Sequence, residues 1–196
     1  MGELILGMKN DKKYHRRSIR LKGHNYSLLG EYFVTICAKN RRCLFGNIVN
    51  DKMVLNDVGM AAERCLRQIP KHYPDAIMDE YIIMPNPVHI IIMINNNIGA
   101  NNYSPLQKEK RPHGTSRTIG AIIRGYKIGV TKWMRKNMHI HDVWQRNYYE
   151  HIIRNESELI KIQEYIVNNP KQWALDTENI NARDIIGRLL QNPLRI

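Results

Sequence analysis

One histidine lies within the most apolar run of the chain. His89 belongs to residues 88–94, and on a strand it shares one face with position 87, Ile91 and Met93. A histidine in such a run either packs in the core with its polar atoms satisfied or binds a metal ion. The first arrangement is the more frequent, so His89 alone does not indicate a metal site.

A tyrosine and an asparagine lie one turn apart on a predicted helix. The apolar stripe of residues 156–169 consists of Leu159, Ile162 and Ile166. At about 100° per residue, Tyr165 lies at the edge of this stripe, and Asn169 follows on nearly the same side. A tyrosine at such an edge usually packs its ring and leaves its hydroxyl in water, although a phenol oxygen is also a possible nucleophile.

Aromatic and basic side chains alternate in residues 144–149. There Arg146 and Tyr148 belong to a stretch that either stacks nucleic-acid bases or forms a half-buried strand. Arg41 and Arg42 follow the first predicted strand, where a basic pair is commonly part of a solvated turn. Both groups are candidates for contacts with nucleic acid.

The charge of the chain indicates a polyanionic partner. The chain has 196 residues, 43% of them hydrophobic, with 30 Lys and Arg against 18 Asp and Glu, a net charge of +12. Residues 1–50 contribute +7 and residues 101–136 contribute +8, so two segments carry the whole excess. In the second segment, Arg124, Lys127 and Lys132 fall on the polar side of a predicted helix. The alternative is a basic surface that only keeps the protein in solution.

Several protein classes are excluded by composition. The apolar content is that of a folded domain and not of a disordered chain. Three cysteines cannot make a disulfide scaffold and indicate reduced thiols in the cytoplasm. No apolar run approaches the roughly 20 residues that span a bilayer, and no signal peptide is visible, so no membrane partner is expected.

The pattern predicts strands and helices in the order β-α-β-β-α-β, with a further helix at the end. We expect strands at 31–38, 76–84, 88–94 and 142–153, and helices at 54–73, 116–138 and 156–169. Asn56 or Asp57 is the expected cap of the first helix, and 155–158 resembles a capping box.

This order predicts an α+β fold of the ferredoxin-like, split β-α-β type. Its antiparallel sheet would have helices on one face, plus an extra C-terminal helix that carries Tyr165. Residues 1–30 are expected to form a basic arm, 31–170 the domain, and 171–196 a tail. The central strands lack the aromatic residues that an RNA-recognition motif needs.

Four stretches together resemble the REP-associated tyrosine transposases, a branch of the single-tyrosine HUH transposases of the insertion-sequence-200 type. The stretches run in family order over roughly residues 15–175. They are Tyr32-Phe-Val-Thr-Ile-Cys with Asn40-Arg-Arg, Glu80-Tyr-Ile-Ile-Met-Pro-Asn-Pro-Val-His89, Trp144-Gln-Arg-Asn-Tyr-Tyr-Glu-His-Ile-Ile-Arg154, and Glu164-Tyr-Ile-Val-Asn-Asn-Pro170.

The resemblance implies cleavage and rejoining of single-stranded DNA through a 5′-phosphotyrosine. Tyr165 would be the nucleophile, and His89 and Asn169 would bind Mg²⁺ or Mn²⁺, which polarises the phosphate. The DNA, single-stranded or a hairpin, would be bound by basic and aromatic residues, and relatives are monomers or homodimers. We assign the DNA contacts to Arg41, Arg42, Arg124, Lys127, Lys132, Arg146, Tyr148 and Arg154.

One residue departs from the family pattern. The first of the two family histidines falls at Pro87, which has no side-chain ligand atom. Activity is therefore expected to be impaired, unless Asn86, His24 or His113 compensates. The sequence leaves three hypotheses: a weakened DNA-cleaving transposase, a catalytically inactive protein that binds DNA hairpins or single strands, and an unrelated basic RNA-binding protein.

Overall fold

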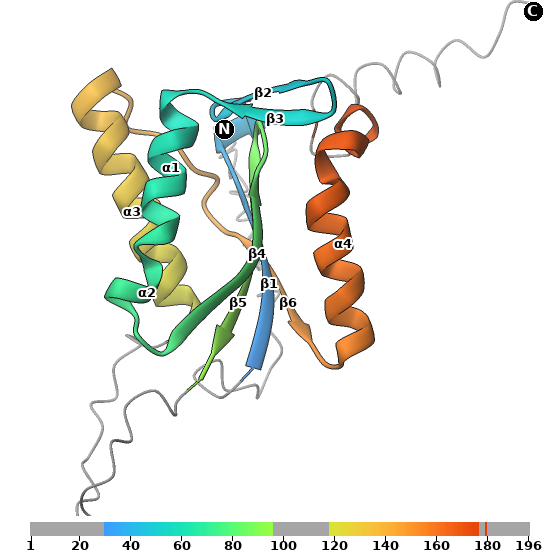
Figure 1. Ribbon diagram of the computed structural model, residues 1–196. Helices are drawn as coiled ribbons and strands as arrows, with labels where there is room; N and C mark the ends of the chain where they lie inside the picture. Colours follow the sequence, from blue (N-terminus) through green and yellow to red (C-terminus); the bar gives the residue numbers. More distant parts are fainter. Residues whose placement is uncertain (1–29, 96–117, 177–178, 180–196) are drawn as a thin grey trace, which may run out of the picture.

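The computed structural model describes residues 30–95, 118–176 and 179. The expected arm (except Gly30), His24, His113, most of the loop after residue 95 and most of the tail lie outside these residues. The elements, shown in Figure 1, are β1 (Gly30–Cys37), η1 (Lys39–Arg41), β2 (Gly46–Val49), β3 (Lys52–Leu55), α1 (Asp57–Arg67), α2 (Ile69–His72), β4 (Ala76–Ile83), β5 (Pro87–Ile94), α3 (Ile119–Met138), β6 (Tyr149–Ile153), α4 (Glu156–Gln172) and η3 (Trp173–Leu175).

The main sheet has four strands in the order β4-β5-β1-β6, and each neighbouring pair is antiparallel. β5 therefore separates β1 from β4, the two strands that α1 connects, which is the split β-α-β arrangement. β5 is buried along nearly its whole length, which confirms its predicted central position. The pairing of β1 with β5 places Thr35 opposite His89.

Helices cover both faces of this sheet. α1 and α3 pack on one face, where Tyr32 and Val34 of β1 belong to the main core, and α4 packs on the other face (Figure 1). There Ile166 of α4 packs with Ile91 of β5 and Phe33 of β1. α1 and α3 share one face, as expected, and the extra C-terminal helix covers the opposite face. Because β5 is apolar on both sides, each of its faces needs a covering layer.

A hairpin absent from the sequence prediction precedes α1. β2 and β3 pair antiparallel as a separate two-stranded sheet, and Val54, expected in the helix, pairs with Asn47. α1 therefore starts at Asp57 and not at residue 54. Asn56 is its cap, as expected, because its side-chain oxygen accepts from the amide of Gly59 at 3.0 Å.

The strand expected over 142–153 is shorter in the structure: residues 149–153 pair with β1 as β6, and before them an isolated antiparallel bridge joins Trp144 to Ala38. The ammonium of Lys127 donates to the carbonyl oxygens of Gln145 and Asn147, both at 2.9 Å. The indole of Trp144 donates to the Lys127 carbonyl oxygen at 3.1 Å. These contacts hold the segment before β6 against α3, while the Gln145 amide still donates to the Cys37 carbonyl oxygen at 2.9 Å.

Two further findings concern the class of protein. In the described part of the chain, no helix is long and apolar enough to cross a membrane. Cys37, Cys43 and Cys65 form no disulfide with one another in the structure.

Candidate active site

A cavity of about 450 Å³ opens on the face of the sheet that α4 covers. It is lined by alternate residues of β1, by one residue each of β5 and α4, by the segment before β6, and by the turn after η3. The lining residues are Phe33, Thr35, Cys37, Arg41, His89, Gln145, Asn147, Tyr148, Tyr149, Tyr165 and Asp176. The cavity thus brings together two of the three residues that the resemblance places at the reaction centre.

His89 is buried, with 2% of its surface exposed. Its Nδ1 lies 2.9 Å from the hydroxyl oxygen of Thr35, and its ring stacks on Phe33 with centroids 5.7 Å apart. Its Nε2 has no hydrogen-bond partner among the described residues. Burial lowers the pKa of His89 to about 4, against an opposing effect of the Asp176 carboxylate, so the ring is neutral near pH 7.

Tyr165 lies beside this imidazole at the edge of the cavity. Its ring meets the ring of His89 nearly at right angles, with centroids 5.4 Å apart, and it also meets Phe33 edge-on at 6.0 Å. The side chain is 38% exposed, so a bulky group in solution has access to it. An accessible phenol next to a buried, neutral imidazole is suited to attack on a substrate held in the cavity.

Asn169 lies one helical turn after Tyr165 and is 1% exposed. Its amide nitrogen is 3.5 Å from the Oδ2 atom of Asp176, and its Oδ1 finds no hydrogen-bond partner in the described part of the protein. A buried amide oxygen without a partner carries a desolvation cost, which a bound cation or water would offset.

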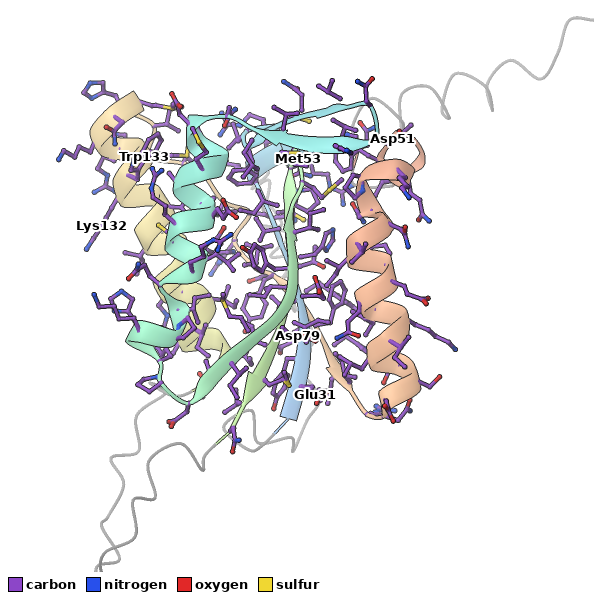
Figure 2. The ribbon with its side chains drawn as sticks, in the orientation of Figure 1. Glu31, Asp51, Met53, Asp79, Lys132 and Trp133 are labelled. Carbon is purple, nitrogen blue, oxygen red and sulfur yellow. The ribbon has the colours of Figure 1, made fainter. Side chains whose placement is uncertain are left out.

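α4 is held on the sheet at its beginning and in its middle. Asn155 caps the helix by accepting from the amide of Glu158 at 2.9 Å, as the capping-box pattern predicts. The carboxylate of Glu158 accepts from the Arg154 amide at 2.8 Å instead of from the cap residue. Further along, Gln163 donates to Asp79 of β4 at 2.6 Å, and Asp79 is labelled in Figure 2. These contacts fix the helix that carries Tyr165.

Pro87 is the first residue of β5, and it is buried. Asn86, one of the residues considered as compensation, accepts a hydrogen bond from the Ala38 amide at 3.0 Å with its side-chain oxygen. That oxygen therefore holds β1 and the start of β5 together. Neither Asn86 nor Pro87 lines the cavity that contains His89.

A second, basic groove of about 470 Å³ runs along the outer side of α3. Five residues assigned to DNA contacts from the sequence line it, namely Arg124, Lys127, Lys132, Arg146 and Tyr148. Arg135, which was not assigned, lines it too. Lys132 points away from the sheet (Figure 2). The ammonium of Lys127 differs from that of Lys132, because it donates to the carbonyl oxygens of Gln145 and Asn147.

Tyr148 lines both the basic groove and the cavity with His89. Arg41 also lines the cavity, on a left-handed backbone with φ of 54°. The guanidinium of Arg42 instead donates to the carbonyl oxygen of Asp142 at 2.8 Å. Arg154 lies just after β6, at the end opposite Tyr149. Of the eight predicted DNA contacts, five therefore line the basic groove, Arg41 lines the cavity with His89, and Arg42 and Arg154 line neither.

Sequence reasoning assigned no individual role to seven of the eleven residues that line the cavity, among them Phe33, Thr35 and Asp176. Phe33 and Thr35 alternate along β1, and this two-residue period was a usable signal. Asp176 follows η3 in an irregular segment, where no pattern indicates its position.

The donors present fit a divalent cation. His89 Nε2 and Asn169 Oδ1 are both buried and without partners among the described residues. The described part of the chain contains no group of three or more His, Cys, Asp and Glu residues suited to a metal ion. A site formed by His89 and Asn169 would use an amide oxygen, a donor outside those four residue types.

Comparisons with known proteins agree with the fold. No family model matches the chain. An uncharacterised protein of Haemophilus influenzae is 52% identical over 166 residues, which cover 83% of this chain and 92% of that protein. The REP-associated tyrosine transposase bound to a REP hairpin has a similar structure, with a TM-score of 0.53, 17% identity, and coverage of 90% of this chain and 89% of the other. A candidate transposase of Deinococcus radiodurans is 18% identical, with a TM-score of 0.42 and coverage of 76% and 97%.

Proposed function

This chain belongs to the same family as the Haemophilus influenzae protein and has the fold of the REP-associated tyrosine transposase, and from this premise we propose that it is a transposase-like DNA-binding protein. Its activity would be cleavage and rejoining of single-stranded DNA through Tyr165. The observation that carries the proposal is the exposed Tyr165 ring, 5.4 Å from the ring of the buried His89.

The covalent step joins the Tyr165 oxygen to the scissile phosphorus. A P–O bond to the phenol oxygen forms, and the bond from phosphorus to the 3′ oxygen of the preceding nucleotide breaks. The phenol proton passes to solvent, and the departing 3′ oxygen takes up a proton and becomes a hydroxyl. The 5′-phosphotyrosine conserves the energy of the bond, so attack by a 3′-hydroxyl restores the DNA and the tyrosine.

A phenol with a pKa of about 10 is a weak nucleophile near neutral pH, so the site must assist it. His89 Nε2 and Asn169 Oδ1 would hold Mg²⁺ or Mn²⁺. The bound ion would supply Lewis-acid stabilisation of the charge on the phosphate oxygens. The Thr35 hydroxyl, 2.9 Å from His89 Nδ1, would accept a hydrogen bond from an Nδ1–H, and in that tautomer the lone pair on Nε2 is available to a cation.

The basic groove provides the surface for the DNA backbone. Arg124, Lys132, Arg135 and Arg146 line it and attract phosphate, and Tyr148 offers a ring on which a base can stack. Because Tyr148 lines the cavity as well, a strand bound in the groove would pass next to Tyr165.

A catalytically inactive DNA-binding protein is the second candidate, and Pro87 favours it. The resemblance requires a histidine where Pro87 lies, and the neighbouring Asn86, whose side-chain oxygen accepts from the Ala38 amide, does not line the cavity. Such a protein would retain the basic groove and bind a hairpin without cutting it.

A covalent-adduct assay separates the two candidates. The full chain is incubated with single-stranded hairpin DNA labelled at its 3′ end, with Mn²⁺ or with EDTA, and run on a denaturing gel. We expect a Mn²⁺-dependent adduct that Tyr165→Phe abolishes. Tyr149→Phe is the matched control, because Tyr149 is 52% exposed and lines the same cavity.

DNA binding is also measured on the same hairpin by fluorescence anisotropy, and the two measurements together separate the candidate functions. Binding without an adduct, together with adduct formation by Pro87→His, would establish the inactive binding protein. An adduct that survives Tyr165→Phe would refute the assigned nucleophile. Absence of DNA binding would refute both candidates.

A further inference from the structure

The metal site proposed above lacks one ligand. A strand with histidines at positions 87 and 89 would supply two imidazoles, and this chain supplies only His89. The remaining donors, His89 Nε2 and Asn169 Oδ1, are both uncharged, whereas Mg²⁺ is usually bound through one or two carboxylates together with phosphate oxygens of the substrate.

We propose that Asp176 supplies the missing ligand, so that the cation is held by the Asp176 carboxylate, His89 Nε2 and Asn169 Oδ1. This inference rests on the proposed function, because it concerns the same site. It adds a metal ligand from the segment after α4, which neither the sequence pattern nor the resemblance assigns.

The position of Asp176 supports this role. It lines the cavity that contains His89 and Tyr165, and its Oδ2 lies 3.5 Å from the amide nitrogen of Asn169. A carboxylate therefore lies beside two buried side chains, each of which has one polar atom without a partner among the described residues.

The turn that carries Asp176 is held by several hydrogen bonds. Its amide donates to the Trp173 carbonyl oxygen at 3.2 Å, and its carbonyl oxygen accepts from the Asn179 amide at 3.0 Å. The side chain of Asn179 also donates to the Trp173 carbonyl oxygen at 2.9 Å, and both of these side chains are buried. Asp176 is thus placed by packing after α4, independently of β5, where Pro87 lies.

The charge of the proposed set is favourable for a divalent ion. The proposed set combines one imidazole, one amide oxygen and one carboxylate, so the carboxylate adds the anionic donor that the other two do not supply. Two imidazoles and an amide would include no anionic donor. Oxygen donors also suit Mg²⁺ and Mn²⁺ better than a second nitrogen does.

Metal binding without DNA tests the inference. Free Mn²⁺ is followed by electron paramagnetic resonance as it is titrated with the full chain. We expect one bound Mn²⁺, and Asp176→Asn should weaken binding by roughly tenfold or more, since loss of a residue that only orients a ligand already costs about 10–100-fold. Glu164→Gln is the control, because it removes one negative charge from an exposed position next to Tyr165.

Each outcome decides the inference. Equal Mn²⁺ affinity of wild type and Asp176→Asn, or no binding by wild type, would overturn it. If Asp176→Asn does not fold, nuclear magnetic resonance of the wild type replaces it. Mn²⁺ should then broaden the signals of His89 and Asp176 and leave those of Lys132 sharp, whereas a sharp Asp176 signal would overturn the inference.

A different measurement, the formation of the Tyr165 adduct, tests the proposed function. If Mn²⁺ binds through Asp176 and no Tyr165 adduct forms, the metal site stands and the cleavage activity is wrong. If the adduct forms equally well with Asp176→Asn, the cleavage activity stands and the role of Asp176 is wrong.

Discussion

Replacement of Thr35 by valine isolates the contact that orients His89. Thr35 and valine have nearly the same shape, so Thr35→Val removes the hydroxyl without opening a cavity. In the wild type the hydroxyl oxygen lies 2.9 Å from His89 Nδ1. Without an acceptor there, the ring proton is better placed on Nε2, which is the atom proposed to bind the cation.

The size of the expected losses in stability and in metal affinity follows from the burial of His89. The ring is 2% exposed, so Nδ1 in the variant gains little from water. Leaving a buried polar atom unsatisfied lowers the free energy of unfolding by about 1–3 kcal/mol. Loss of the partner that fixes a ligating histidine weakens metal binding by about 10–100-fold, which is roughly 1.4–2.7 kcal/mol.

The assay is a Mn²⁺ titration followed by electron paramagnetic resonance, with thermal unfolding of the metal-free protein measured in parallel. Thr131→Val is the matched control, because the Thr131 hydroxyl donates to the Lys127 carbonyl oxygen within α3, away from His89. We expect Thr35→Val to lose affinity and Thr131→Val to keep it. Unchanged Mn²⁺ affinity of a folded Thr35→Val protein would refute the role of Thr35.

Three further predictions concern packing, pH and salt. A Cβ at Gly59 would lie 2.1 Å from the Phe45 carbonyl oxygen, so Gly59→Ala should lower the free energy of unfolding by about 1–3 kcal/mol; unchanged thermal unfolding would contradict this. Burial lowers the pKa of Lys127 from its ordinary 10.5 to about 8, so the unfolded chain binds more protons between these values. The stability of wild type relative to Lys127→Met, measured by urea unfolding, should therefore rise with pH through this window, and a constant difference would contradict it. Arg124→Gln and Arg146→Gln should each weaken hairpin binding and lower its log–log salt slope by about 0.7–0.9; an unchanged slope would place the DNA elsewhere.

The sequence predicts a helix or strand correctly where the spacing of its apolar residues matches the pattern of buried side chains in the structure. β1 and β5 alternate or are apolar throughout, so both were predicted as strands. The β2–β3 hairpin was missed although a signal was present. Its two-residue turn, Asn50 and Asp51, has positive φ at both positions, as a type I′ turn requires, but it lacks the glycine that usually marks such turns.

The site was predictable only where it belongs to regular elements. His89 and Tyr165 lie on a strand and a helix, and the resemblance supplied their roles. Asp176 enters the cavity through a turn held by Trp173 and Asn179, which depends on tertiary packing. The length of β6 depends likewise on a contact distant in sequence, because the Lys127 ammonium binds the carbonyl oxygens before it.

The central claim is that Tyr165 becomes covalently joined to DNA. The most direct measurement is peptide mass spectrometry of the full chain after incubation with single-stranded hairpin DNA and Mn²⁺, followed by nuclease and protease digestion. The account predicts a nucleotide phosphate on the peptide that contains Tyr165, and on no peptide when EDTA replaces Mn²⁺. A nucleotide on Tyr149 or another residue, or no modified peptide at all, would contradict it.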